Sequence, residues 1–282
     1  MSILFAAICG LIQGLAEFLP ISSSGHLALF HNIFGAMDPE SVVSFDVLLH
    51  MGTLLAVFVV FYKDIFPLIP AFFTMLGKLF RGKFKMTEYN ANERMVIAVV
   101  LGCIPLVIGA VLSDYVTAVS SYTWAIGIFL VINAVVLFVS DSLAKGGVNA
   151  DNVKPKNAII VGLCQLVAVL PGISRSGSTI TGGLTQRFDR EFAVKYSFIL
   201  SIPAILGAFV LDIGDMKAIP QTDVLPYIVG TVVAFVSGIC AMKLLVYISR
   251  KANFRAFSYY CAVVGVLAII FGVCGIKIPV NF

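Results

Sequence analysis

Two short serine-rich segments, PISSSG at 20–25 and PGISRSG at 171–177, bring together residue types that could do chemistry. The ionisable residues Glu17, His26 and Arg175 lie in or beside these segments. A glutamate can hold a divalent cation or act as a general base, and a histidine can transfer a proton or act as a nucleophile. An arginine presents a planar fork of donors that matches phosphate oxygens. The combination predicts a site for a phosphate-like anion.

The spacing around the first segment predicts two half-helices that meet at a turn. Gln13 and Glu17 are four residues apart, so a helix presents both on one face. Pro20 ends that helix, and Ser22 and Ser23 stand where the next helix begins, where their hydroxyls can cap it. The free N–H groups and the positive dipole end of such a helix start favour an anion.

The second segment repeats this arrangement around Arg175. Two converging helix starts offer many donors, which favours phosphate over carboxylate as the ligand. Glu17 beside an anion then indicates a carboxylate that holds a bridging divalent cation or acts as a general base. The further polar residues that we expect near the second turn are Gln165, Ser174, Ser176 and Thr179.

Each of these residues also has a structural interpretation. Serines at a helix start often act only as caps, and a single histidine there is often a hydrogen-bonded structural group. Arg175 could close an ion pair with Glu17 or extend to the membrane surface. His50 and Asp46, one helical turn apart, could face the cavity, but a helix-packing hydrogen bond is the favoured role. The functional interpretation therefore depends on the conjunction of Glu17, His26, Arg175 and two serine-glycine turns.

The composition indicates whether these residues belong to a soluble protein or to a membrane protein. The 282 residues are 60% hydrophobic and 12% charged, with a mean hydropathy of +1.02. Soluble domains have about 25% charged residues, so this chain has too little polar surface for a soluble enzyme, a disordered protein or a nucleic-acid-binding protein. The six cysteines lack metal-ligand spacing and are expected to be buried hydrophobic side chains.

Apolar segments of sufficient length predict an all-α integral membrane protein, a single membrane domain over residues 1–282. A bilayer core of about 30 Å needs a helix of about 20 residues. Six segments qualify as transmembrane helices: about 42–62, 93–113, 122–140, 192–212, 224–248 and 257–275.

Two further apolar stretches, 3–35 and 157–187, are interrupted by the serine-rich turns, so neither half of either stretch can span. Broken segments at membrane depth must be buried in protein or line a wet cavity. We therefore expect two re-entrant helical hairpins. The segment 65–80, with two prolines and a basic tail, predicts an interfacial helix.

The chain also contains an internal repeat. A shift of 152 residues brings eight identities into the 17 positions from 10 to 26. Each half, 1–142 and 153–282, then has one hairpin and three spans, and an odd number of spans inverts the second half relative to the first. In such an inverted-topology repeat the two turns enter from opposite faces and meet near the midplane.

The distribution of charge predicts the orientation. With Arg175 set aside, sixteen of the 19 basic residues lie in segments 63–94, 141–195 and 243–255, which the predicted topology places on one face. The positive-inside rule makes that face cytoplasmic and puts both termini outside. Arg175 is the basic residue left at a hairpin turn.

Two motifs resemble the signature regions of the bacterial undecaprenyl-diphosphate phosphatase family, also called the bacitracin-resistance family. They are QGLAEFLPISSSGH at 13–26 and PGISRSGST at 171–179. The resemblance implies a hydrolase of the bacterial inner membrane that removes the terminal phosphate of a polyprenyl diphosphate. Undecaprenyl phosphate is thereby recycled for peptidoglycan synthesis, with bacitracin resistance as a consequence. The resemblance also implies a divalent cation, Mg²⁺ or Ca²⁺, and a site that opens to the outer side.

The resemblance assigns roles to individual residues. Glu17 matches the second acidic residue of the family's (E/Q)-x-x-x-E element, as a catalytic residue and metal ligand. Gln13 matches the first and cannot carry charge, so metal binding or base function rests on Glu17. His26 matches the family's catalytic histidine, and the nucleophile is left open between His26 and Ser23. Arg175 is expected to be catalytic, and the expected phosphate-binding residues are Gln13, Ser22, Gln165, Ser174, Ser176 and Thr179.

A second function class remains open from the sequence. Inverted repeats with broken helices are typical of transporters, so the chain could instead move a polyprenyl phosphate across the membrane. A transporter needs binding residues but no nucleophile, and the conjunction of Glu17, Ser23 and His26 favours hydrolysis. The sequence also leaves open whether the chain forms a homodimer.

Overall fold

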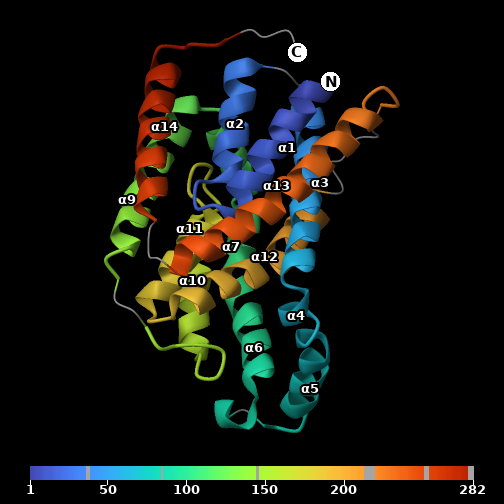
Figure 1. Cartoon of the computed structure of the whole chain (residues 1–282), viewed down its shortest axis with the longest axis vertical. Helices are drawn as coiled ribbons and strands as arrows, with labels where there is room; N and C mark the ends of the chain where they lie inside the picture. Colours follow the sequence, from blue (N-terminus) through green and yellow to red (C-terminus); the bar gives the residue numbers. More distant parts are fainter. Residues whose placement is uncertain (36–38, 84, 144–145, 213–219, 251–253, 279–282) are drawn as a thin grey trace.

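The computed structural model describes residues 1–35, 39–83, 85–143, 146–212, 220–250 and 254–278. In these ranges the protein is all-α, without a β-strand (Figure 1). The helices are α1 (Ile3–Phe18), α2 (Ser23–Phe34), α3 (Pro39–Val60), α4 (Tyr62–Ile65), α5 (Leu68–Phe80), α6 (Ala91–Cys103), α7 (Leu106–Val111), α8 (Ser113–Ser120), α9 (Thr123–Ser140), α10 (Pro155–Val167), α11 (Arg175–Thr185), α12 (Arg190–Asp212), α13 (Val224–Arg250) and α14 (Arg255–Val273), with a 3₁₀ turn at Met86–Glu88.

The six predicted spans are confirmed as helices that are long and apolar enough to cross a membrane. Five of them are α3, α9, α12, α13 and α14, and the sixth runs through α6 and α7 from Ala91 to Val111. The span predicted at about 93–113 contains a break in its helix. Pro105 has no N–H to donate, and the helix is interrupted there before α7 begins.

The two interrupted stretches form pairs of short helices joined by tight turns. α1 and α2 flank the first turn, and α10 and α11 flank the second. The turns pack against each other: a Cβ atom added to Gly25 would lie 2.7 Å from Cα of Gly172, and one added to Gly177 would lie 3.3 Å from Cβ of Pro20. A shift of 152 residues converts one contact into the other. The re-entrant path of these hairpins through a bilayer stays a prediction.

The first helix of each hairpin packs closely against a span of the other half. α1 packs along α13, where Gly10 approaches Gly230, and α10 packs on α6, where Gly162 approaches Gly102. A Cβ atom at Gly10 would lie 2.2 Å from the Gly230 carbonyl oxygen, and one at Gly162 would lie 2.5 Å from the Gly102 carbonyl oxygen. Each hairpin is therefore held against a span of the other half by backbone contact that only glycine permits.

Of the segments rich in basic residues, 63–94 lies at the lower end of Figure 1 and the loop before α10 in its lower half, and the start of α14 lies beside Asp141, whose carboxylate accepts hydrogen bonds from the N–H groups of Phe254 and Arg255. Lys195 pairs with Asp64 at 2.9 Å, and Arg94 donates to the carbonyl oxygen of Asp151. At the opposite end, the Met1 amino group lies 3.0 Å from Asp223. The loops that the sequence placed on one face therefore lie together, and the assignment of that face to the cytoplasm stays a prediction.

The segment predicted to be an interfacial helix forms α4 and α5. α5 packs against α6 through buried Ala71 and Met75, whereas Phe73 and Phe80 are exposed. Its helix ends directly before the basic tail, at the lower end of Figure 1.

The glycine contacts predict a stability difference. Gly10→Ala should lower the thermal unfolding midpoint in detergent, because overpacking of a tight contact costs about 1–3 kcal/mol. Gly207→Ala in α12 is the matched control, since no atom lies within 4 Å of an added Cβ there. Its midpoint should be unchanged or slightly raised. Equal midpoints for Gly10→Ala and the wild type would contradict the close α1–α13 approach.

Candidate active site at the two hairpin turns

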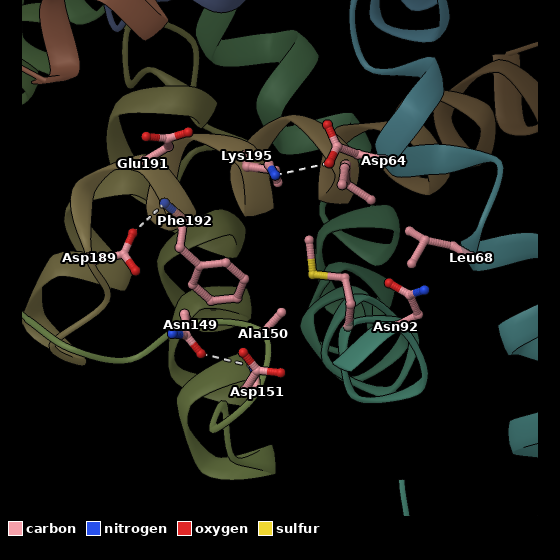
Figure 2. Close-up of a pocket in the computed structure, with 12 residues that line it drawn as sticks. Asp64, Leu68, Asn92, Asn149, Ala150, Asp151, Asp189, Glu191, Phe192 and Lys195 are labelled. Carbon is pink, nitrogen blue, oxygen red and sulfur yellow. Dashed lines mark hydrogen bonds and ion pairs between the residues drawn. The ribbon is translucent and has the colours of Figure 1, made fainter. Parts of the chain in front are cut away.

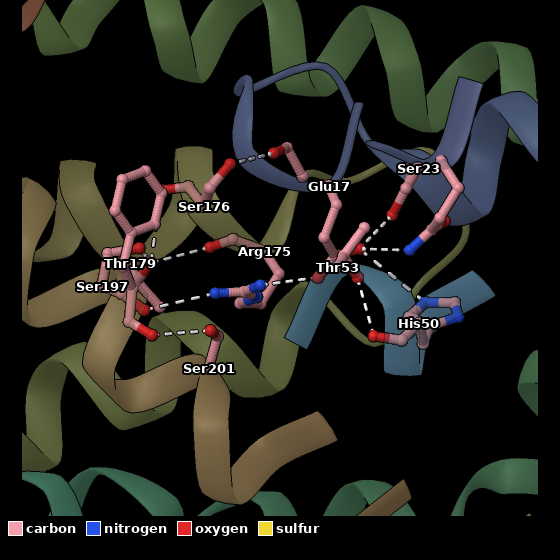
Figure 3. Close-up of polar contacts among 12 residues, drawn as sticks. Glu17, Ser23, His50, Thr53, Arg175, Ser176, Thr179, Ser197 and Ser201 are labelled. Carbon is pink, nitrogen blue, oxygen red and sulfur yellow. Dashed lines mark hydrogen bonds and ion pairs between the residues drawn. The ribbon is translucent and has the colours of Figure 1, made fainter. Parts of the chain in front are cut away.

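Glu17 is the centre of a buried polar cluster built from four helices (Figure 3). Its Oε1 accepts a hydrogen bond from the Arg175 guanidinium at 2.6 Å. Its Oε2 accepts from the Ser23 hydroxyl at 2.7 Å and from the Gln13 amide at 3.1 Å. The Nε2 atom of His50 lies 3.7 Å from the same Oε2. Glu17 is thus the meeting point of both hairpins and of α3.

Local sequence explains the position of Ser23. α1 ends at Phe18, and the chain turns through Pro20 before α2 begins at Ser23. Ser22 caps α2 with an unusual backbone φ of 74°, a region that residues other than glycine rarely adopt. Its hydroxyl accepts hydrogen bonds from the N–H groups of Gly25, at 3.3 Å, and Gly172, at 3.2 Å. The strained turn is thereby held by both hairpins, and it points Ser23 at Glu17.

Arg175 is the first residue of α11, directly after the cap residue Ser174. Its guanidinium donates to Glu17 and also to the Ser197 carbonyl oxygen of α12, at 3.2 Å. These two contacts engage two of the five donors that a guanidinium offers. In the described part of the chain, donors therefore remain for an anionic ligand beside Glu17.

The hydroxyls around the second turn also connect the two halves. Ser176 donates to the carbonyl oxygen of Leu19 at 3.2 Å, and Ser174 accepts from the Gly177 N–H at 3.1 Å. Thr179 lies 2.6 Å from the Ser197 hydroxyl. These contacts show how Ser174, Ser176 and Thr179 hold the turn, while their expected role in phosphate binding stays a prediction.

His26 points to a different part of the fold. Its Nδ1 lies 2.8 Å from the Ser22 carbonyl oxygen, and its Nε2 lies 2.9 Å from the Tyr260 hydroxyl on α14. The two rings also stack, with centroids 5.5 Å apart and an angle of 11° between their planes. Both ring nitrogens thus bond to groups outside the Glu17 cluster, and Tyr260 is a neighbour that the sequence did not indicate.

His50 is a member of the cluster to which the sequence gave mainly a helix-packing role, with a place facing the cavity as the alternative. Its spacing from Asp46 was noted, and its Nδ1 does lie 2.7 Å from the Asp46 backbone oxygen, as a hydrogen bond within α3. That bond leaves the opposite edge of the ring facing Glu17. The spacing could not reveal this, because it does not show which helix lies next to α3.

Two buried glutamines carry amide atoms without hydrogen-bond partners in the described part of the chain. Gln13 is fully buried, and its Oε1 is unpartnered although its amide nitrogen donates to Glu17. Gln165 is 1% exposed, and neither atom of its amide group has a partner. The Gln13 oxygen is an available acceptor or ligand next to Glu17.

A cavity of about 470 Å³ lies between two of the segments rich in basic residues, 63–94 and 141–195 (Figure 2). Its lining includes Asp64, Asp189 and Lys195, and it extends to Ile199 of α12. None of the expected site residues lines it. The candidate site is the Glu17 cluster and not this cavity, because buried ionisable groups from both halves converge on Glu17.

The donor set fits a divalent cation only in part. No group of three or more His, Cys, Asp or Glu residues that could hold a metal occurs within the described ranges. Glu17 offers one carboxylate and Gln13 offers an unpartnered oxygen. Mg²⁺ typically takes one or two carboxylates and completes its shell with water and phosphate oxygens, so the residues fit a cation that is shared with a phosphate ligand.

The arrangement as a whole supports nucleophilic chemistry on an anion. A serine hydroxyl that donates to a carboxylate is a nucleophile with a base in place. The Arg175 guanidinium and the first N–H groups of α2 and α11 can stabilise negative charge next to it.

Comparison with known proteins places the chain among membrane proteins of one family. The family model for bacitracin resistance protein BacA matches residues 6–267. A protein from Methanobrevibacter smithii named undecaprenyl-diphosphatase is 40% identical over 270 residues, which cover 95% of this chain and 96% of the relative. Proteins of the same name from Methanosphaera stadtmanae and Desulforapulum autotrophicum are 39% and 38% identical. These alignments cover 97% and 96% of this chain and 99% of each relative.

The buried ion pair predicts coupled effects on stability. Glu17→Gln or Arg175→Gln alone should lower the thermal unfolding midpoint in detergent, because an unpaired buried charge costs about 3–5 kcal/mol. The double variant should lose less than the sum of the single losses. Lys195→Gln is a matched control, because its ion pair with Asp64 is over one-third exposed on both sides and is worth at most about 1 kcal/mol. Additive losses at Glu17 and Arg175 would argue against the pair.

Proposed function

The chain belongs to the bacitracin resistance protein BacA family, and from this membership we propose that it is an undecaprenyl-diphosphatase. It removes the terminal phosphate of undecaprenyl diphosphate and releases undecaprenyl phosphate and inorganic phosphate. The lipid carrier thus returns to peptidoglycan synthesis, and its turnover confers resistance to bacitracin. The alignments run along nearly the whole of the relatives, which supports transfer of the complete activity.

The observation that carries the mechanism is the 2.7 Å hydrogen bond from the Ser23 hydroxyl to Glu17. Ser23 Oγ attacks the terminal phosphorus, the bond from phosphorus to the bridging oxygen breaks, and undecaprenyl phosphate leaves. Glu17 takes the serine proton as general base. Water then attacks the phosphoserine, and the bond from phosphorus to Ser23 Oγ breaks while protonated Glu17 returns its proton to Oγ. The oxygen and both hydrogens of the water leave with the phosphate, as dihydrogen phosphate.

Arg175 and the two helix starts supply the electrostatic part. The terminal phosphate carries its charge on oxygens that face away from the bond being broken, and preorganised donors stabilise that charge in the transition state. Arg175 has the fork geometry for this task, and its contacts with Glu17 and Ser197 hold it in place before the substrate binds.

His26 takes a positioning role in this proposal, and Ser23 is the nucleophile. The His26 ring connects Ser22 to Tyr260, and Ser22 precedes the reactive serine. A nitrogen that already lies 2.9 Å from a phenol hydroxyl has to leave that contact before it can attack phosphorus. Ser23 has its base in contact and needs no such rearrangement.

A divalent cation, Mg²⁺ or Ca²⁺, is proposed to bind beside Glu17 and the Gln13 carbonyl oxygen. When bound, it supplies Lewis-acid neutralisation of the diphosphate charge. Glu17 would hold the cation, and with it the diphosphate, next to Ser23. Gln13 fixes the Glu17 carboxylate through its amide nitrogen.

The protein is a multi-pass membrane protein, and we propose that the two hairpins are re-entrant and enter from opposite faces. The basic segments would face the cytoplasm by the positive-inside rule, with both termini and the mouth of the site on the outer side. The apolar chain of the substrate would lie against the lipid-facing surfaces of the helices.

Transport of a polyprenyl phosphate is not favoured as the function. A carrier needs groups that bind the lipid phosphate but has no use for a serine that donates to a buried carboxylate. The relatives named undecaprenyl-diphosphatase also support hydrolysis.

Purified protein in detergent should release inorganic phosphate from undecaprenyl diphosphate. Ser23→Ala and Glu17→Gln should each lower kcat by about 10³-fold or more, since the nucleophile and its base act as a unit. Ser24→Ala, at an exposed neighbouring position, is the matched control and should keep near wild-type activity. Full activity in Ser23→Ala together with loss in His26→Ala would reverse the assignment of the nucleophile.

Removal of divalent cations should stop the reaction. Phosphate release should fall to background in EDTA and return when Mg²⁺ or Ca²⁺ is added in excess, because the diphosphate charge is then neutralised again. Undiminished release in EDTA after prior dialysis against chelator would rule out the proposed cation.

A further inference from the structure

The position of His50 deepens the proposed function, because this residue faces the Glu17 carboxylate without a hydrogen bond to it. The Nε2 atom lies 3.7 Å from Oε2 of Glu17, which is beyond hydrogen-bond distance. Its side chain is 33% exposed, whereas that of Glu17 is 7% exposed. His50 is therefore the more exposed of the two side chains.

The tautomer of His50 follows from its other contact. The Nδ1 atom lies 2.7 Å from the backbone oxygen of Asp46, and a carbonyl oxygen can only accept a hydrogen bond. Nδ1 must therefore carry the hydrogen, and in the neutral ring Nε2 has a free lone pair. A protonated ring would pair with Glu17 directly as an imidazolium, whereas the neutral ring and the carboxylate present two lone-pair donors to a cation placed between them.

The positive group already present lies on the other side of Glu17. Arg175 bonds to Oε1, whereas His50, Gln13 and Ser23 approach Oε2 (Figure 3). The Gln13 oxygen is fully buried and has no hydrogen-bond donor in the described part of the chain. Glu17 Oε2 and His50 Nε2 are thus two electron-pair donors 3.7 Å apart, and the unpartnered Gln13 oxygen belongs to the amide group whose nitrogen contacts the same Oε2.

We propose that His50 is a ligand of the divalent cation, in a site completed by Glu17 and the Gln13 carbonyl oxygen. The inference rests on the proposed cation-dependent phosphatase and adds a residue from α3 to its site. The hydrogen bond from Nδ1 to the Asp46 backbone is the kind of outer contact that orients a metal-binding imidazole. The third protein ligand is an amide oxygen, so the set differs from a cluster of three acidic, histidine or cysteine side chains.

A nitrogen ligand changes which cation the site prefers. Imidazole suits ions such as Zn²⁺ and Ni²⁺, whereas Ca²⁺ takes oxygen ligands. The site should therefore bind Ni²⁺ more tightly than Ca²⁺. His50→Gln, which offers an oxygen in place of the nitrogen, should reduce or reverse that preference.

The test measures Mn²⁺ binding to the full chain in detergent by electron paramagnetic resonance, without substrate. His50→Ala and Glu17→Gln should each raise the Mn²⁺ dissociation constant about tenfold or more. His31→Ala is the matched control: His31 lies on α2 with its Nε2 3.6 Å from the Asp46 carboxylate, and its loss should leave the constant unchanged. Unchanged affinity in His50→Ala, with loss in Glu17→Gln, would overturn the assignment.

A spectroscopic readout separates a ligand from a residue that only shapes the site. Electron spin-echo modulation of bound Mn²⁺ should show coupling to a directly bonded ¹⁴N nucleus in the wild type. The coupling should disappear in His50→Ala and persist in His31→Ala. Absence of ¹⁴N coupling in the wild type would exclude His50 as a ligand, whatever the affinities.

Phosphate release by the same variants distinguishes failure of this inference from failure of the proposed function. If wild-type protein hydrolyses undecaprenyl diphosphate but shows no His50-dependent Mn²⁺ binding, only the ligand assignment fails. If wild-type protein binds Mn²⁺ through His50 but releases no phosphate, the proposed function fails and the cation site remains. Equal unfolding midpoints of His50→Ala and His31→Ala would exclude misfolding as the cause of a difference between them.

Discussion

The ion pair between Glu17 and Arg175 is the interaction on which the rest of the structure depends. Two opposite charges 158 positions apart in the chain are buried, and each alone would be costly at that depth. The pair can form only if both hairpin turns reach the same place. The contact of Gly25 with Gly172 and the cap at Ser22 can be understood as the means by which the turns meet.

Close backbone contact provides the rigidity that this meeting requires. In a membrane, helices gain little from hydrophobic burial against each other, so stability comes from packing and from hydrogen bonds. The approach of Gly10 to Gly230 and of Gly162 to Gly102 fixes each hairpin against the opposite half. With both hairpins fixed, the backbone at Ser22 can hold a strained conformation that a looser protein would relax. Ser23 is thereby oriented before any ligand arrives.

The sequence predicted the membrane-spanning helices better than it predicted the contacts between side chains of different helices. All six spans could be located because a long apolar run in a chain of this composition indicates a membrane-spanning helix. Glu17 and Arg175 could be identified because they are charged residues in apolar surroundings. Hydropathy located the span at 93–113 but not the break in its helix at Pro105, because hydropathy does not report hydrogen bonding. The place of His50 beside Glu17, and of His26 beside Tyr260, depends on which helices are neighbours. Neither apolar length nor local spacing contains that information, so these partners needed the fold.

The correspondence between the halves has a consequence for how a diphosphate can be oriented. The shift of 152 residues that superimposes the turns in sequence aligns Ser23 with Arg175 and Glu17 with Val169. Two identical turns related by a two-fold axis would accept the two ends of a diphosphate interchangeably. Here one copy of the position carries a hydroxyl and the other a guanidinium, so the two orientations differ in free energy. Divergence at these duplicated positions gives the two ends of the site different chemistry.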